Sequence, residues 1–261
     1  MMKALFTLLW FLASGLALAA SPCDAIPGKL SHAPLKIESG VVCFVEQPLL
    51  DEKGEKYADA ISIYLIPHGL KPVEAEGRGL MYDYDAGKIV DAFSLDIDHD
   101  GKNELVVIHY HDVRYSQAEQ NSSGVVYSVY VFNQEKNSLN YNERATEWFG
   151  SSYSWFTNGK NKVYEYPYLT QKSVQKALSS PFISLMHQNK AISIVVKQKS
   201  YLYESSTVYG KPKKYLIAGD KATVDKYTAG WCRVNYTGGK QPLQMWIMCD
   251  ALEVDKKGKE Q

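Results

Sequence analysis

Alternation of apolar and polar positions predicts a chain built mainly from β-strands. Short runs rich in Val, Ile, Tyr and Phe are bounded by Gly, Asn, Asp or Pro, the pattern of strands separated by turns. The predicted strands are 41–46, 60–67, 88–95, 105–111, 125–133 and 162–166. One helix is predicted at 170–178, where TQKSVQKAL begins with the capping residue Thr170 and stops before Ser179-Ser180-Pro181.

The strand pattern changes along the chain. Beyond Ala191 the strands become shorter and the turns tighter, which predicts two domains, at 20–190 and at 195–254. The charge-rich end, 255–261, is expected to be a solvated tail.

The first residues have the layout of a secretory signal peptide. Lys3 precedes an apolar run, 4–18, and Ala17-Leu18-Ala19 fits a cleavage site, so 1–19 are expected to be removed. A retained anchor and a lipid anchor on Cys23 are the alternatives; Pro22 disfavours the second. No further run is long enough to span a membrane, so the mature chain is expected outside the cytoplasm without a membrane span.

Composition argues against a nucleic-acid partner and, together with export, favours disulfide-bonded cysteines. Basic and acidic residues are equal at 29 each, and no basic stripe exists to neutralise phosphates, so no nucleic-acid partner is expected. Export favours disulfides, and the alternative, a metal site, lacks the Cys-x2-Cys spacing that zinc prefers. A hairpin turning at Lys240 and Gln241 would place Cys232 opposite Cys249, which leaves Cys23 to pair with Cys43.

The segment DIDHDGKNE has the spacing of a calcium loop. Carboxylates fall at loop positions 1, 3, 5 and 9, a glycine at position 6 permits a sharp turn, and position 7 would give its backbone carbonyl. The predicted ligands are Asp96, Asp98, Asp100, Lys102 and Glu104. The loop is not an EF-hand, because Val107 occupies position 12 and the flanks are strands. It resembles the calcium hairpins of integrin-type propeller repeats and related bacterial β-domains, which implies a structural Ca²⁺; the alternative is an acidic turn without metal.

The C-terminal stretch, 200–252, resembles a bacterial SH3 domain. The residues that carry the resemblance are Tyr201-Leu202-Tyr203, the run 214–221 (KYLIAGDK), the run 230–234 (GWCRV) and Trp246-Ile247. The chain departs from the family pattern at Ala218 and Met245. The resemblance implies an aromatic groove lined by Tyr203, Tyr209, Trp231 and Trp246, although burial of Trp231 in the core is the favoured reading of that residue.

The order of the first domain resembles periplasmic inhibitors of invertebrate-type lysozyme and related immunity proteins. A strand leads into the calcium loop, then ELVVIHYHDVRY, a polar loop and SGVVYSVYVF. In that family a Ser-Gly followed by Tyr enters the hydrolase cleft, which implies an inhibitory loop with Ser123, Gly124 and Tyr127. The alternative is that Ser123 and Gly124 form a simple turn and Tyr127 is a strand residue.

Catalytic alternatives are weaker. His109 and His111 share one strand face beside Asp112, which permits a zinc site, but spacing places no third ligand. A Ser-His-Asp hydrolase stays open, since triads are recognised by geometry, yet no Gly-x-Ser-x-Gly elbow is present.

These observations predict a mainly β protein, with a β-propeller-like or β-sandwich-like calcium-binding domain followed by a small SH3-like β-barrel. The expected function is non-enzymatic: a periplasmic inhibitor or immunity protein that blocks a muramidase-type peptidoglycan hydrolase. The alternative is an envelope module that recognises peptidoglycan or a protein through the SH3-like part.

Overall fold

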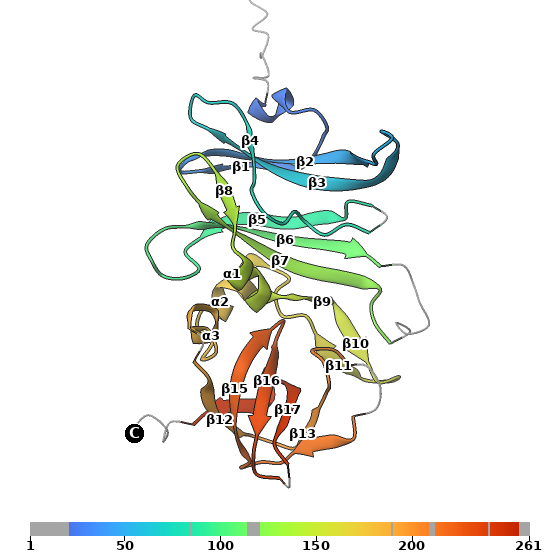
Figure 1. Cartoon of the computed structure of the whole chain (residues 1–261), viewed down its shortest axis with the longest axis vertical. Coiled ribbons are helices and arrows are strands. Elements are labelled where there is room, and N and C mark those ends of the chain that lie inside the picture. Colours follow the sequence, from blue (N-terminus) through green and yellow to red (C-terminus); the bar gives the residue numbers. More distant parts are fainter. Residues whose placement is uncertain are drawn as a thin grey trace, which may run out of the picture.

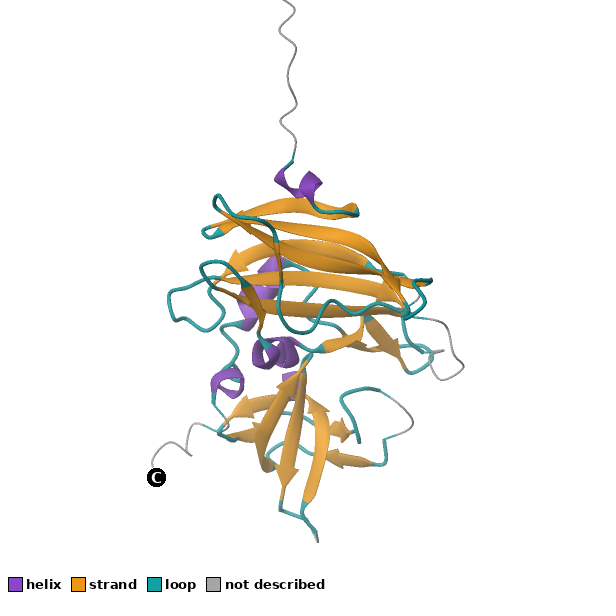
Figure 2. Ribbon diagram, turned by 45° about the horizontal axis from the view of Figure 1, so that its top comes forward, coloured by secondary structure: helices purple, strands orange, loops and turns teal. Residues whose placement is uncertain are grey.

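The computed structural model describes residues 21–83, 85–113, 121–188, 190–208, 212–239 and 241–255. Antiparallel strands make up about half of these residues and helices about a tenth, which confirms the mainly β prediction (Figure 2). The predicted signal peptide, 1–19, lies outside the described residues. Within the described ranges, no helix is long and apolar enough to cross a membrane.

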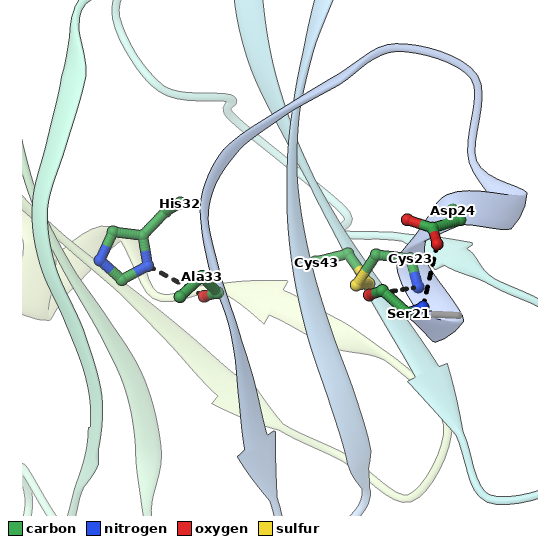
Figure 3. The surroundings of a disulfide bond; sticks show 6 residues. All are labelled: Ser21, Cys23, Asp24, His32, Ala33 and Cys43. Atoms are coloured by element: carbon green, nitrogen blue, oxygen red, sulfur yellow. Dashed lines mark hydrogen bonds between the residues drawn. A yellow bond between two sulfur atoms is a disulfide. The ribbon is translucent and has the colours of Figure 1, made fainter. Parts of the chain in front are cut away.

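The first sheet has four strands in sequence order. They are β1 (Lys29–Ile37), β2 (Gly40–Leu50), β3 (Lys56–Pro67) and β4 (Val73–Glu74). The short helix η1 (Pro22–Ala25) precedes them and is tied to β2 by the disulfide Cys23–Cys43, as predicted (Figure 3). Its first turn is capped because the Ser21 hydroxyl accepts from the Cys23 amide at 3.3 Å.

The second sheet has five strands, of which four follow sequence order and one is added on β7. They are β5 (Lys88–Leu95), β6 (Glu104–Asp112), β7 (Val125–Gln134), β8 (Leu139–Tyr141) and β9 (Ser151–Tyr153). This sheet stacks face to face on the first, as Figure 1 shows, with Phe44 and Ile63 in one core with Val107 and Phe132.

The central strands β6 and β7 are buried on both faces. Leu105 and Val107 of β6 face the first sheet, while Val106 and Ile108 belong to a second core on the opposite side. That side is covered by three short helices, α1 (Glu143–Phe149), α2 (Gln171–Ala177) and α3 (Ser184–His187). The second sheet is therefore the middle layer of the molecule.

The C-terminal part is a five-stranded sheet with strand order β17-β16-β15-β12-β18. Its strands are β12 (Ile192–Val196), β15 (Lys221–Thr228), β16 (Trp231–Tyr236), β17 (Leu243–Met248) and β18 (Leu252–Val254), with η3 (Cys249–Ala251) between the last two. Two small two-stranded sheets accompany it, β13 (Ser200–Leu202) with β14 (Lys214–Leu216), and β10 (Trp155–Thr157) with β11 (Lys162–Glu165). The described strands do not close into a barrel, so the predicted SH3-like barrel geometry stays a prediction.

The second predicted disulfide, Cys232–Cys249, is also present. The predicted register was wrong, however: Cys232 pairs with Ile247 across β16 and β17, and Cys249 reaches back from η3, where its amide donates to the Gly230 carbonyl. Lys240, at the expected turn, lies outside the described residues.

One hydrophobic core joins the two predicted domains. Trp148 of α1 stacks on Tyr227 of β15 with ring centroids 4.3 Å apart, and its indole N–H donates to the Phe182 carbonyl. The same core contains Val129 and Val131 of β7 and Trp231 of β16. The hydrophobic core is therefore continuous across the predicted domain boundary near residue 190.

Candidate functional site

The predicted calcium loop connects β5 to β6. Leu95 and Glu104 are the last strand pair of this antiparallel hairpin, and the loop between them curls in a tight turn. His99 and Gly101 have positive φ angles of 61° and 86°. A Cβ on Gly101 would meet nothing within 4 Å, so backbone conformation rather than space favours glycine there.

Backbone amides organise the acidic side chains. Asp96 Oδ2 accepts from the Gly101 amide at 3.1 Å, and Asp98 Oδ1 accepts from the Asp100 amide at 3.2 Å. Asp100 Oδ1 accepts from the Lys102 amide at 2.7 Å. These bonds hold the loop in one curl and bring its carboxylates toward a common centre.

Three of the five predicted ligands gather at that centre. Asp96, Asp98 and Glu104 each offer an oxygen within 4.8 Å of the others, a separation that suits joint coordination of one cation. Asp96 Oδ1 is buried and has no hydrogen-bond partner. Asp100 is not in this group; its second oxygen lies 4.0 Å from the Lys102 ammonium.

Glu104 is the buried member of the group, with 5% of its surface exposed. Burial raises the pKa of its carboxyl, the bond from the Ile97 amide at 2.8 Å lowers it, and the carboxylates of Asp98, Asp100 and Asp96 raise it. In the metal-free site the carboxylates therefore repel one another, and a bound cation would offset that repulsion.

Two clefts border the loop. One, of about 200 Å³, lies between Asp98 and Glu104 on one side and α1 and α3 on the other, where Arg144 and His187 line it. The larger one, of about 530 Å³, lies where Gly101–Asn103 of the loop meet the ends of the two stacked sheets. The acidic loop thus lies at the junction of all three layers.

The predicted inhibitory residues lie at the other end of β6 and β7. The Ser123 hydroxyl donates to the Val125 carbonyl at 2.9 Å, and the Ser123 amide donates to the Trp155 carbonyl at 3.1 Å. Gly124 has a φ of 71° with open space where a side chain would stand. This turn is a braced surface feature. Its neighbour Trp155 is 37% exposed and is not among the site residues that the sequence predicts.

Tyr127 lies inward of that turn, on β7. Its half-buried ring packs at 5.3 Å from the ring of Tyr110 and 6.3 Å from that of Tyr166. Burial raises the pKa of the Tyr127 hydroxyl. The structure therefore places Tyr127 as a strand residue behind the turn, while Ser123 and Gly124 lie in the turn itself.

The predicted aromatic groove is mostly filled. Trp231 is fully buried and packs against Tyr203 with ring centroids 5.2 Å apart. Tyr203 and Trp246 are half-buried and pair backbone to backbone. Tyr209 lies outside the described residues.

The histidine pair is a buried core feature. His109 and His111 stack with ring centroids 6.2 Å apart, and His109 Nε2 bonds to the Ala86 carbonyl at 2.9 Å. Burial lowers the pKa of His109 to about 4 and also lowers that of His111. Asp112 is exposed, and across the described ranges no third ligand atom joins the two rings as a metal group would need.

Comparison with known proteins gives no match: no family model fits the chain, and no curated protein or solved structure is similar to it. The resemblances to lysozyme inhibitors and to bacterial SH3 domains therefore rest on the motifs alone.

Proposed function

We propose that the chain is an exported periplasmic protein that binds and blocks a peptidoglycan hydrolase of the muramidase type. In this proposal the first two sheets are a β-sandwich-like domain, and the C-terminal sheet with β13 and β14 is an SH3-like module. The export signal and the order of calcium loop, central strand and Ser-Gly turn support it.

The observation that carries the proposal is the braced, open turn at Ser123 and Gly124. It is held to β10 through Trp155 and is an extension of β6 and β7, which are buried on both faces. Ser123 and Gly124 are partly exposed, and a turn braced in this way loses little conformational entropy on binding, which favours tight insertion into a cleft. The glycine offers bare backbone to a narrow groove whose catalytic carboxylates accept hydrogen bonds.

The test is inhibition of cell-wall lysis by a panel of purified muramidases. Gly124→Asn adds a side chain in open space and uses a residue that tolerates the left-handed conformation. We expect it to weaken inhibition tenfold or more by obstructing insertion. Gly219→Asn is the matched control, because Gly219 also has a positive φ of 89° and open surroundings, but lies in the C-terminal part.

Two results would contradict the inhibitory function. One is that no muramidase is bound or slowed; the other is that Gly124→Asn inhibits as well as the native chain. Retention on murein sacculi without any inhibition would instead support the alternative, an envelope-binding module.

The role proposed for the acidic loop is a structural Ca²⁺ site. Asp96, Asp98 and Glu104 would bind the ion through carboxylate oxygens, with Asp100 and the Lys102 carbonyl as further candidates, and so clamp β5 to β6. Calorimetric titration with calcium should show one site, and Asp98→Ala should abolish it. Asp91→Ala on the adjacent strand is the control that should bind normally.

A further inference from the structure

A second surface combines exposed aromatic rings with lysines and has no role in the proposed inhibition. It is the outer face of the β13–β14 hairpin, called here the tyrosine–lysine face: Lys199, Tyr201, Lys213, Tyr215 and Ile217. Tyr201, Tyr215 and Ile217 are 49%, 50% and 52% exposed, which is high for large apolar side chains.

The hairpin geometry gathers these side chains on one side. Tyr201 and Tyr215 are direct cross-strand partners, with ring centroids 6.4 Å apart at 82°. The adjacent positions Leu202 and Leu216 point inward and are buried. Lys213 and Ile217 flank β14 and are exposed, and the strand alternation continued by one residue at each end would place them on the side of Tyr215.

The charge beside the rings is positive. Lys199 Nζ lies 4.2 Å from the centroid of Tyr215 and 5.8 Å from that of Tyr201, in cation–π contact with both. The nearby carboxylate of Asp220 accepts from the Ile217 amide at 2.8 Å and from the Tyr236 hydroxyl at 3.4 Å. Glu204 follows β13 at a position of the opposite parity, so alternation directs it away from this face.

Another exposed tyrosine pair provides a comparison with the hairpin. Tyr57 and Tyr82 are 58% and 39% exposed and share a side-chain hydrogen bond. Their neighbours in the sequence include the carboxylates of Glu55, Asp59 and Asp83. Lys56 also lies beside Tyr57 and pairs with Asp59 at 2.7 Å, so charges of both signs surround this pair.

We propose that the tyrosine–lysine face docks the protein on an anionic lipid bilayer. Tyrosine rings partition into the bilayer interface with the hydroxyl toward water, and lysines extend their ammonium groups to lipid phosphates. Three exposed apolar side chains and two lysines give weak, reversible attachment, in which charge and apolar contact are both needed. Such docking would hold the rest of the molecule against a membrane, a property separate from hydrolase inhibition.

The test is cosedimentation with vesicles. The chain is produced without residues 1–20, because the apolar run 4–18 would bind lipid by itself. We expect binding to vesicles of phosphatidylethanolamine and phosphatidylglycerol, and little binding to phosphatidylcholine. Raising the salt from about 0.1 M to about 0.5 M should release most of the protein, since screening shortens the range of the attraction.

The variants separate charge from aromatic contact. Lys199→Gln with Lys213→Gln should lower the partition coefficient about 25-fold, from roughly fivefold per lysine. Tyr201→Ser with Tyr215→Ser should abolish retention at low lipid. The matched control, Tyr57→Ser with Tyr82→Ser, should bind like the native chain.

The proposal is overturned if the native chain is not retained on anionic vesicles, or is retained equally on neutral ones. It also fails if the lysine pair and the control pair lower binding alike. Because the salt and lipid comparisons use the native chain, they decide the matter even where a variant folds poorly. Retention on isolated glycan strands in place of vesicles would likewise overturn it.

Discussion

Replacing Asp98 by Asn should stabilise the metal-free chain and remove most of its stabilisation by calcium. Asp98 lies within 4.8 Å of the oxygens of Asp96 and Glu104, so in the metal-free chain it contributes only repulsion to the group. The Asn amide oxygen can still accept the Asp100 amide, which keeps the loop bond. The variant therefore removes one charge and leaves the turn intact.

The size of this stabilisation follows from the distance between the carboxylate oxygens, up to 4.8 Å. Two unit charges at that distance repel by about 1 kcal/mol in water and by about 3.5 kcal/mol at an effective dielectric constant of about 20. Asp98 is exposed, so the lower figure applies to each of its two pairs. Asp98→Asn should stabilise the metal-free chain by about 1–2 kcal/mol, or raise the melting temperature by about 2–8 °C.

Calcium should therefore reverse the order of stability of the two proteins. At a free concentration one hundred times the dissociation constant, binding stabilises the native chain by about 2.7 kcal/mol. The assay is thermal unfolding followed by circular dichroism, with EGTA or with calcium. Native protein should be the less stable of the two in EGTA and the more stable in calcium. A variant that is weaker in EGTA, or keeps the full calcium response, would refute the reasoning.

Three further predictions concern stability. The pKa of His109 is lowered from 6.5 to about 4, so between these pH values the unfolded chain binds a proton that the folded chain does not bind. The free energy of unfolding should therefore be at its full value above pH 6.5 and be about 3 kcal/mol lower at pH 4. Urea titrations across that range should show a shallower pH slope for His109→Phe, and an unchanged slope would contradict the assignment. Replacing Cys23 and Cys43 by Ala should cost about 3 kcal/mol, because their bond closes a loop with a sequence separation of 20; a loss below about 1 kcal/mol in denaturant titration would contradict this. Calorimetry should show one cooperative transition, since Trp148 and Tyr227 share a core across the predicted domain boundary, and two separated peaks would mean that the parts unfold independently.

The strands were predictable because alternation and turn residues act locally. The predicted 88–95 coincides with β5, and the other five predicted strands overlap β2, β3, β6, β7 and β11. Thr170 was identified as a cap because its hydroxyl and the Ser173 amide are three residues apart, a distance that the sequence displays.

The missed elements depend on contacts that the sequence does not display. The helix α1 has only seven residues, and it is stabilised by the packing of Trp148 on Tyr227, a residue far along the chain. The edge strand β1 carries His32 and Pro34 among exposed positions, which obscures its alternation.

The candidate site likewise has some features that the sequence displays and others that depend on the fold. Spacing alone predicted Asp96, Asp98, Asp100, Lys102 and Glu104 as ligands, and the fold brings the carboxylates of three of them, Asp96, Asp98 and Glu104, together. The burial of Glu104 and its bond to the Ile97 amide follow from the layer packed over the loop, so they could be found only in the fold.

The C-terminal sheet carries a consequence for the order of folding. Its last strand, β18, pairs with β12, which precedes it by more than fifty residues. A chain made from its N-terminus acquires β18 after all the other strands of this sheet, so β12 keeps an unpaired edge while the intervening strands are synthesised. A chain cut short before Leu252 would therefore carry an open, aggregation-prone edge on β12 that quality-control proteases can recognise.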